Sequence, residues 1–187
     1  MKFALYIVSA LLAVTSTLAT ALPEGEIVER DLEARQRNQA CGDPRRVVPW
    51  FRAFNPRIVD HFYTANRAEI QNSFRQGYNN EGTAGYVFPS RQPGTVAFFR
   101  LFSQRGTDHF YTTNATERNN AVARLGYRNE GITGWIYPNP RCGGVALFRL
   151  FNSRRVDHFY TTSASERDSA ARSGYANEGI AGYIYPF

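Results

Sequence analysis

The pentapeptide DHFYT occurs three times in this chain, at residues 60–64, 108–112 and 157–161. These copies contain every histidine of the sequence, namely His61, His109 and His158. The similarity extends well beyond the five letters and divides the chain into three repeats, at residues 47–94, 95–144 and 145–187. A fixed period in this range indicates a repeat architecture. Because the array stops after three copies, it suits a closed ring better than an open solenoid with capping repeats.

Each repeat begins with an apolar segment that is rich in aromatic residues and predicts a strand. These segments are WFRAFN at 50–55, FFRLFS at 98–103 and LFRLFN at 147–152. A short variable turn then leads to DHFYT, which predicts a second strand. We expect the two strands of each repeat to form a hairpin.

A predicted helix follows DHFYT in every repeat. A residue that can cap a helix stands three positions before a glutamate, as in a capping box, where the glutamate reaches back to the cap. The cap residues are Asn66, Asn114 and Ser163, and the glutamates are Glu69, Glu117 and Glu166. A glycine in the left-handed conformation should end each helix; these are Gly77, Gly126 and Gly174. The apolar positions expected to cover the sheet are Ile70, Phe74, Val122, Leu125, Ala170 and Ala171.

A third strand should close each repeat. The segments GYNNEGTAGYVFP at 77–89, GYRNEGITGWIYP at 126–138 and GYANEGIAGYIYP at 174–186 share an N-E-G step, which predicts a turn or bulge into that strand. Proline then ends it. The predicted fold is therefore α+β and mostly β, with three β-β-α-β repeats in a closed pseudo-threefold arrangement, either small propeller-like or trefoil-like.

The combined pattern R-L-F-N…D-H-F-Y-T-T…E-R…G-Y-x-x-E-G-I-A-G-Y-I-Y-P resembles a repeat family of unknown function. The resemblance covers roughly residues 48–187. That family occurs in secreted fungal proteins and in bacterial extracellular proteins, often beside cell-wall or carbohydrate-active enzymes. The resemblance implies secretion and suggests binding to a glycan or a cell wall, but it supplies no established chemistry.

The N-terminal segments predict export. Residues 1–21 read as a signal peptide, with Lys2 before a short apolar run and an A-x-A cleavage site at its end. Residues 22–40 are either a pro-segment, cut after Arg35, or a disordered arm. Residues 41–187 then form one domain, secreted to the extracellular space or cell wall, with no membrane span and as a monomer. Cys41 and Cys142 predict a single disulfide bond.

Catalysis and metal binding are the less favoured interpretations of DHFYT. An active site needs different residues that converge on one point, whereas here every polar residue of interest occurs in triplicate. Three histidines on a pseudo-threefold axis could bind zinc, but each strand lacks the local ligand spacing of typical zinc sites. We therefore assign no catalytic residue, no metal and no cofactor.

A structural network within each repeat is the favoured interpretation. An arginine on the first strand, and the aspartate and histidine of DHFYT, should form a satisfied hydrogen-bonded group that fixes the geometry of its repeat. This predicted network consists of Arg52, Asp60, His61, Arg100, Asp108, His109, Arg149, Asp157 and His158.

Candidate ligand-binding residues follow the helices, where aromatic rings and planar polar groups recur together. The set is Tyr78, Asn80, Glu81, Tyr127, Asn129, Glu130, Trp135, Tyr175, Asn177 and Glu178. Such groups suit a sugar, and three equivalent shallow sites would give avidity for a polymer. Asn114-Ala115-Thr116 is a glycosylation sequon, and we expect a glycan on Asn114 to compete with its role as a helix cap.

The net charge is +6, and Lys2 is the only lysine. Because the arginines are spread over all repeats without a basic run, nucleic acid is not an expected partner. The sequence favours a secreted, non-catalytic, lectin-like module for a glycan or cell-wall polymer. A secreted scaffold or effector that binds another extracellular protein is the first alternative, and a glycoside or cell-wall hydrolase is the second.

Overall fold

The computed structural model describes residues 41–186, so the predicted signal peptide and pro-segment lie outside the described residues. A short 3-10 helix, η1 (Pro44–Arg46), precedes the repeats. Repeat one comprises β1 (Val48–Asn55), β2 (Asp60–Thr64), α2 (Arg67–Arg75) and β3 (Asn79–Val87). Repeat two comprises β4 (Val96–Ser103), β5 (Asp108–Thr112), α3 (Ala115–Arg124) and β6 (Arg128–Ile136). Repeat three comprises β7 (Val145–Asn152), β8 (Asp157–Thr161), α4 (Ala164–Arg172) and β9 (Ala176–Ile184). The predicted β-β-α-β order is confirmed.

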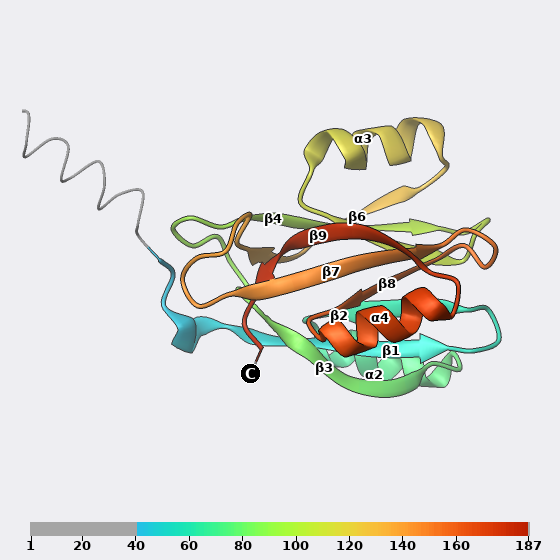
Figure 1. The fold of residues 1–187 in the computed structure, drawn as a ribbon, viewed down its shortest axis with the longest axis horizontal. Coiled ribbons are helices and arrows are strands. Elements are labelled where there is room, and N and C mark those ends of the chain that lie inside the picture. Colours follow the sequence, from blue (N-terminus) through green and yellow to red (C-terminus); the bar gives the residue numbers. More distant parts are fainter. Residues whose placement is uncertain (1–40, 187) are drawn as a thin grey trace, which may run out of the picture. The chain divides into compact units, whose positions relative to one another are not determined.

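Each repeat forms one antiparallel sheet with its first strand in the centre. The strand orders are β2-β1-β3, β5-β4-β6 and β8-β7-β9. The predicted hairpins are present, and DHFYT coincides with β2, β5 and β8. The N-E-G step produces a bulge, because the register between β1 and β3 shifts between Phe51 and Ala53, opposite this step. The three hairpin turns lie at the right of Figure 1, and the C-terminal end of β9 lies toward the left.

The helix boundaries confirm the predicted caps but correct the predicted role of the glutamates. The side chain of Asn66 accepts hydrogen bonds from the N–H groups of Ala68 and Glu69. The N–H of Asn66 itself donates to Thr64 Oγ1, at 3.0 Å. The threonine of DHFYT thus takes the place that a capping-box glutamate would occupy, which frees the glutamate to bind elsewhere.

The helices bury less apolar surface than the sequence predicts. Ile70 is buried, but Phe74, Val122 and Leu125 are exposed, and Leu125 keeps 67% of its surface accessible. Ala121 is the buried residue on α3 instead. Because the inner side of each helix meets charged side chains of the next repeat, little of it is available for apolar packing.

The main core lies between the three sheets and receives equivalent residues from each repeat. Its members are Trp50, Tyr63, Val87, Phe98, Tyr111, Ile136, Leu147, Tyr160 and Ile184. Each of them is at most 1% exposed. Full burial of one large apolar side chain stabilises a fold by about 1.5–3 kcal/mol. With nine buried residues, this cluster should contribute more to the stability of the fold than the smaller apolar clusters do.

Three tyrosines of DHFYT connect the sheets at this core. The hydroxyl of Tyr111 donates to the carbonyl of Tyr63 at 2.8 Å and accepts the N–H of Tyr63 at 2.8 Å. Tyr160 makes the same pair of bonds to the backbone of Tyr111, and Tyr63 makes it to the backbone of Tyr160. Because β2, β5 and β8 are edge strands, their outer N–H and C=O groups need such partners when they are buried.

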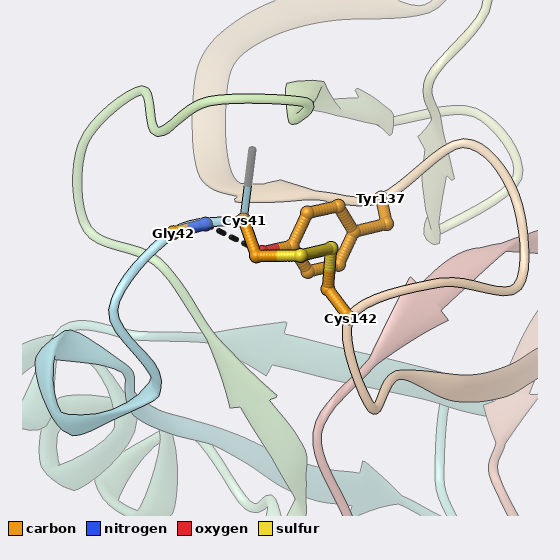
Figure 2. The surroundings of a disulfide bond; sticks show 4 residues. All are labelled: Cys41, Gly42, Tyr137 and Cys142. Carbon is orange, nitrogen blue, oxygen red and sulfur yellow. Dashed lines mark hydrogen bonds between the residues drawn. A yellow bond between two sulfur atoms is a disulfide. The ribbon is translucent and has the colours of Figure 1, made fainter. Parts of the chain in front are cut away.

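The opposite end of the core is held by backbone bridges and a disulfide bond. The bridges join Tyr86 to Tyr185, Phe88 to Trp135 and Tyr137 to Tyr183. The Cys41–Cys142 bond, predicted from the sequence, has a Cα–Cα distance of 5.7 Å. Beside this bond the N–H of Gly42 donates to the hydroxyl of Tyr137 at 3.0 Å (Figure 2). This end therefore fixes the segment that precedes repeat one to the end of repeat two.

Removal of one tyrosine hydroxyl tests the connection between sheets. Tyr111→Phe should destabilise the protein by about 1–3 kcal/mol, because the buried N–H and C=O of Tyr63 lose their partner. Tyr183→Phe is the control, since this half-buried ring has no side-chain hydrogen bond among residues 41–186. Urea unfolding of both variants measures the difference, and equal stabilities would contradict the proposed role of the hydroxyl.

The disulfide bond makes a separate prediction. Mass spectrometry of the alkylated, non-reduced protein should show both Cys41 and Cys142 blocked by one intramolecular bond. Reduction should lower the melting temperature, because the bond closes a loop with a sequence separation of 101 residues and can contribute up to about 4–5 kcal/mol. Two alkylated thiols in the non-reduced protein would contradict this assignment.

Candidate functional site

The aspartate of each DHFYT binds the histidine of the next repeat. Asp60 accepts the backbone N–H of His109 at 2.9 Å, and its other oxygen lies 2.7 Å from His109 Nδ1. Asp108 binds His158 in the same way, at 2.8 and 2.7 Å. Asp157 binds His61, at 2.9 and 2.8 Å. The network was expected within each repeat, and that expectation is wrong: the contacts run between repeats.

The three aspartates also meet one another. Their carboxylate oxygens lie within 4.8 Å of one another, and all three residues are fully buried. Each carboxylate also accepts the hydroxyl of a tyrosine from its own repeat, and these residues are Tyr78, Tyr127 and Tyr175. Each carboxylate already binds the backbone N–H and the imidazole of one histidine and the hydroxyl of one tyrosine. For this reason we assign no ion to this cluster. It is the aspartates, and not the histidines, that converge.

The arginine of each first strand joins two glutamates at the same boundary. Arg100 donates from both terminal nitrogens to Glu69 of repeat one, each at 2.8 Å. Its Nε lies 2.9 Å from Glu130 of its own repeat. Arg52 forms the equivalent pairs with Glu166 and Glu81, and Arg149 forms them with Glu117 and Glu178. The predicted arginines are therefore part of the network, and they too connect neighbouring repeats.

The phenylalanine of DHFYT lies beneath these charged groups. The guanidinium of Arg100 stands 5.3 Å from the ring centre of Phe62, and the His109 ring centre is 4.8 Å away. Phe110 has Arg149 and His158 in these positions, and Phe159 has Arg52 and His61. The cation–π contact and the aromatic contact hold both polar side chains at the boundary.

Three equivalent pockets lie over these boundaries, one between each pair of neighbouring repeats. The first has a volume of about 290 Å³ and includes Tyr78, Glu69, Arg100, His109 and Glu130 in its lining. The second, about 440 Å³, is lined by the equivalent Tyr127, Glu117, Arg149, His158 and Glu178. The third, about 270 Å³, is lined by Tyr175, Glu166, Arg52, His61 and Glu81. We call them the boundary pockets.

The boundary pockets contain part of the predicted binding set. The tyrosines that follow the helices and the glutamates of the N-E-G step line them, but from opposite sides of each boundary. The asparagines are not in the lining. Asn80 accepts the N–H of Gly82 at 3.0 Å and so stabilises the bulge, and Asn129 and Asn177 do the same. Trp135 packs in the cluster of Phe88, Tyr137 and Tyr185.

Sequence reasoning missed the helix contribution to the pockets. The sequence pattern identifies Glu69, Glu117 and Glu166 as capping residues only, and it assigns no role to the exposed positions three residues later. These positions are Asn72, Asn120 and Ser169, and each faces its pocket. The signal in the sequence is that all three repeats have a polar residue at this same helix position. A single polar residue on an exposed helix would not indicate a binding site.

The electrostatics of the pockets follow from burial and ion pairing. Burial raises the pKa of Glu69, whereas hydrogen bonds from Arg100 and Thr64 lower it. The hydrogen bonds together outweigh burial, so the net pKa is below the ordinary value of 4.5. Glu117 and Glu166 have the same net direction for the same reasons. Burial and the neighbouring aspartate raise the pKa of Tyr78, so its hydroxyl keeps the proton that it donates. Each boundary therefore holds an ionised helix glutamate beside its arginine.

The same repeats define the family of this chain. The family described as Domain of unknown function (DUF5648) matches residues 49–185. The chain belongs to this family. DUF5648 thus spans all three boundary pockets, and its description assigns no function. Comparisons with curated proteins and with solved structures find no match.

Two further findings concern the environment of the DUF5648 domain. In the described part of the chain, no helix is long and apolar enough to cross a membrane. The disulfide bond fits an oxidising compartment.

The glutamate pKa values predict how stability depends on pH. A carboxyl with a lowered folded pKa stabilises the fold above its unfolded value, and this stabilisation is lost as pH falls through the folded pKa. We expect a constant melting temperature from pH 7 to about pH 5 and a decline below about pH 4.5. The variant Glu69→Gln/Glu117→Gln/Glu166→Gln should be less stable at pH 7 and should lose less on acidification. An identical acid response in both proteins would rule out these glutamates as its source.

Proposed function

We propose that this protein is a secreted, non-catalytic binding module that holds a glycan or cell-wall polymer in its three boundary pockets. The observation that carries the proposal is the repetition of one polar pocket at every boundary between repeats. Each copy has an arginine, a histidine, a tyrosine and two glutamates in its lining. Three weak and equivalent sites suit a polymer with repeating units, because binding at one site raises the effective concentration at the others.

The proposal includes a closed pseudo-threefold arrangement of the repeats. It is supported by cyclic contacts: repeat one binds two, two binds three, and three binds one through the aspartate–histidine pairs. The tyrosine hydroxyls form a second such cycle. Closure of this kind makes the third boundary equivalent to the other two, so that all three pockets can engage one polymer.

The chemistry of the pockets favours a neutral, hydroxyl-rich ligand. Planar carboxylate and guanidinium groups can hydrogen-bond to pairs of hydroxyls. Glu81 and Glu178 each use one oxygen for an arginine, and the other oxygen has no partner among residues 41–186. Because two glutamates pair with a single arginine at each boundary, an acidic sugar would meet net repulsion there.

Secretion is part of the proposal and is supported by the disulfide bond and by the N-terminal sequence. Glycosylation of Asn114 is compatible with its cap, contrary to the expected competition. The cap uses Oδ1, which accepts from Thr116 and Glu117, whereas a glycan is attached at Nδ2. Asn114 is exposed and lies in the lining of the second pocket, so a glycan there would reduce access to that pocket alone.

One observation favours hydrolysis as a second candidate function. The buried Asp60 orients His109 through Nδ1, which leaves Nε2 toward the pocket and 3.9 Å from Glu130. An aspartate that orients a histidine is a common arrangement for a general base. The same arrangement occurs at all three boundaries, whereas a single active centre would need different groups around it, and for this reason we favour binding.

Blocking the pockets tests the proposed function. Asn72→Trp, Asn120→Trp and Ser169→Trp each place a large ring in one pocket from an exposed helix position. Retention on insoluble β-glucan, chitin and mannan is measured for single, double and triple variants. We expect retention to fall in steps and to be lost in the triple variant, because each step removes one contact of a multivalent interaction.

The matched control places the same ring one position earlier on each helix. Gln71→Trp, Asn119→Trp and Asp168→Trp are exposed and outside the boundary pockets, so retention should be unchanged. Retention that survives in the triple pocket variant would contradict the proposal. Release of reducing ends from a polysaccharide, lost in His109→Ala, would favour the hydrolase. Capture of a protein partner with no retention on any polysaccharide would favour the scaffold or effector.

A further inference from the structure

The three hairpin turns gather at one end of the domain. The turns occupy residues 56–59, 104–107 and 153–156, between the first two strands of each repeat. They are followed directly by the aspartates whose oxygens lie within 4.8 Å of one another. Thr107 Oγ1 donates to the carbonyl of Ile58 at 3.1 Å, so neighbouring turns are in contact. Figure 1 shows these turns at the end of the domain opposite to the C-terminal end of β9.

Exposed arginines are concentrated at this end. The turns contribute Arg57, Arg105, Arg154 and Arg155. The helices end at the same place, because the side chain of Asn55, beside the first turn, donates to the carbonyl of Gln76 after α2, at 3.1 Å. Their last turns contribute Arg75, Arg124 and Arg172. We call this set the arginine-rich end.

The arginines of the turns are not paired with acidic side chains. Arg45 and Arg167, elsewhere on the surface, form ion pairs with Asp43 and Asp168. Within residues 41–186, by contrast, Arg57, Arg105, Arg154 and Arg155 form no ion pair. The aspartates beneath the turns are fully buried and bound by histidine and tyrosine. The positive charge at this end is therefore directed to solvent.

The backbone fixes where these arginines stand. Val59, Thr107 and Val156 have φ values of 52°, 51° and 53°. β-branched residues rarely adopt this left-handed conformation, and a surrounding structure must hold them in it. The guanidinium of Arg57 also lies against Gly77 at the end of α2, which joins turn and helix end in one surface. The surrounding structure therefore holds the backbone from which the turn arginines project.

We propose that the arginine-rich end binds an acidic polysaccharide through its carboxylate groups, at a site separate from the boundary pockets. Arginine binds carboxylates in a bidentate manner, and several arginines on turns that lie at one end of the domain suit a polymer with a regular charge. Each boundary pocket has two glutamates and one arginine in its lining, so an acidic polymer should not compete with a neutral ligand there. We favour a polysaccharide over nucleic acid because the disulfide bond fits an oxidising compartment.

The test uses the full chain and polygalacturonate as the probe, with fully methyl-esterified polygalacturonate as its uncharged equivalent. The turn variant Arg57→Gln/Arg105→Gln/Arg154→Gln is compared with Arg45→Gln/Arg46→Gln/Arg91→Gln, which removes the same charge from exposed residues outside the arginine-rich end. Calorimetry at about 150 mM salt, where long-range attraction is screened, should show binding to the charged polymer alone. The turn variant should lose affinity by about tenfold, and the control should lose less than about twofold.

Each of three results would overturn the proposal: equal losses in the two variants, equal binding to the esterified polymer, or tighter binding to double-stranded DNA that the turn variant abolishes. If the turn variant melts at a lower temperature, Arg75→Gln/Arg124→Gln/Arg172→Gln replaces it, with the same expected loss. The turn variant should keep its retention on neutral polysaccharide. The double pocket variant Asn72→Trp/Asn120→Trp should keep its binding to polygalacturonate; Ser169→Trp is left out of this comparison because Ser169 accepts a hydrogen bond from Arg172. The two proposals can therefore fail independently.

Discussion

The hydrogen bond from the aspartate of one repeat to the histidine of the next is the contact on which the rest of the structure depends. Asp60 supplies both oxygens to His109, and the bonds involve a backbone N–H as well as the ring. Asp60 therefore fixes both the edge of the neighbouring strand and the orientation of the imidazole. No repeat can complete this group alone, because its aspartate and its histidine bind different neighbours. Removal of the imidazole would leave the buried carboxylate with only the backbone N–H and the tyrosine hydroxyl as partners, which should destabilise the fold.

Every residue of DHFYT makes a contact at or beside a boundary between repeats. The aspartate binds the next histidine, the phenylalanine supports the next arginine, and the tyrosine hydroxyl satisfies the backbone of another tyrosine. The threonine binds the helix, since Thr64 Oγ1 meets both Asn66 and Glu69. A five-residue strand thus encodes the contacts between repeats. Its three identical copies are explained by three identical boundaries, without any need for catalysis.

The sequence predicted the elements well because their signals are local. Strand pattern, helix caps and glycine ends depend on neighbouring residues, and the structure has them where expected. The partners of Asp60 and Arg100 could not be predicted in this way, because a repeat sequence is the same whether a residue binds its own repeat or the next. The buried side of the helices was misjudged for a related reason: Leu125 is apolar, but the neighbouring repeat presents Arg149 and His158 to that pocket.

A boundary built from charged groups has a consequence for binding. The arginine and glutamates of each pocket are already held by one another, so a ligand meets a fixed pattern of donors and acceptors and does not have to order them. The same groups also stabilise the contact between repeats, for example through Glu69 and Arg100. Substitution of these residues would change stability and affinity together, and could not separate the two. Asn72 and its equivalents touch the pocket from exposed positions and carry none of the contacts between repeats, so their substitution can change ligand binding without breaking a boundary.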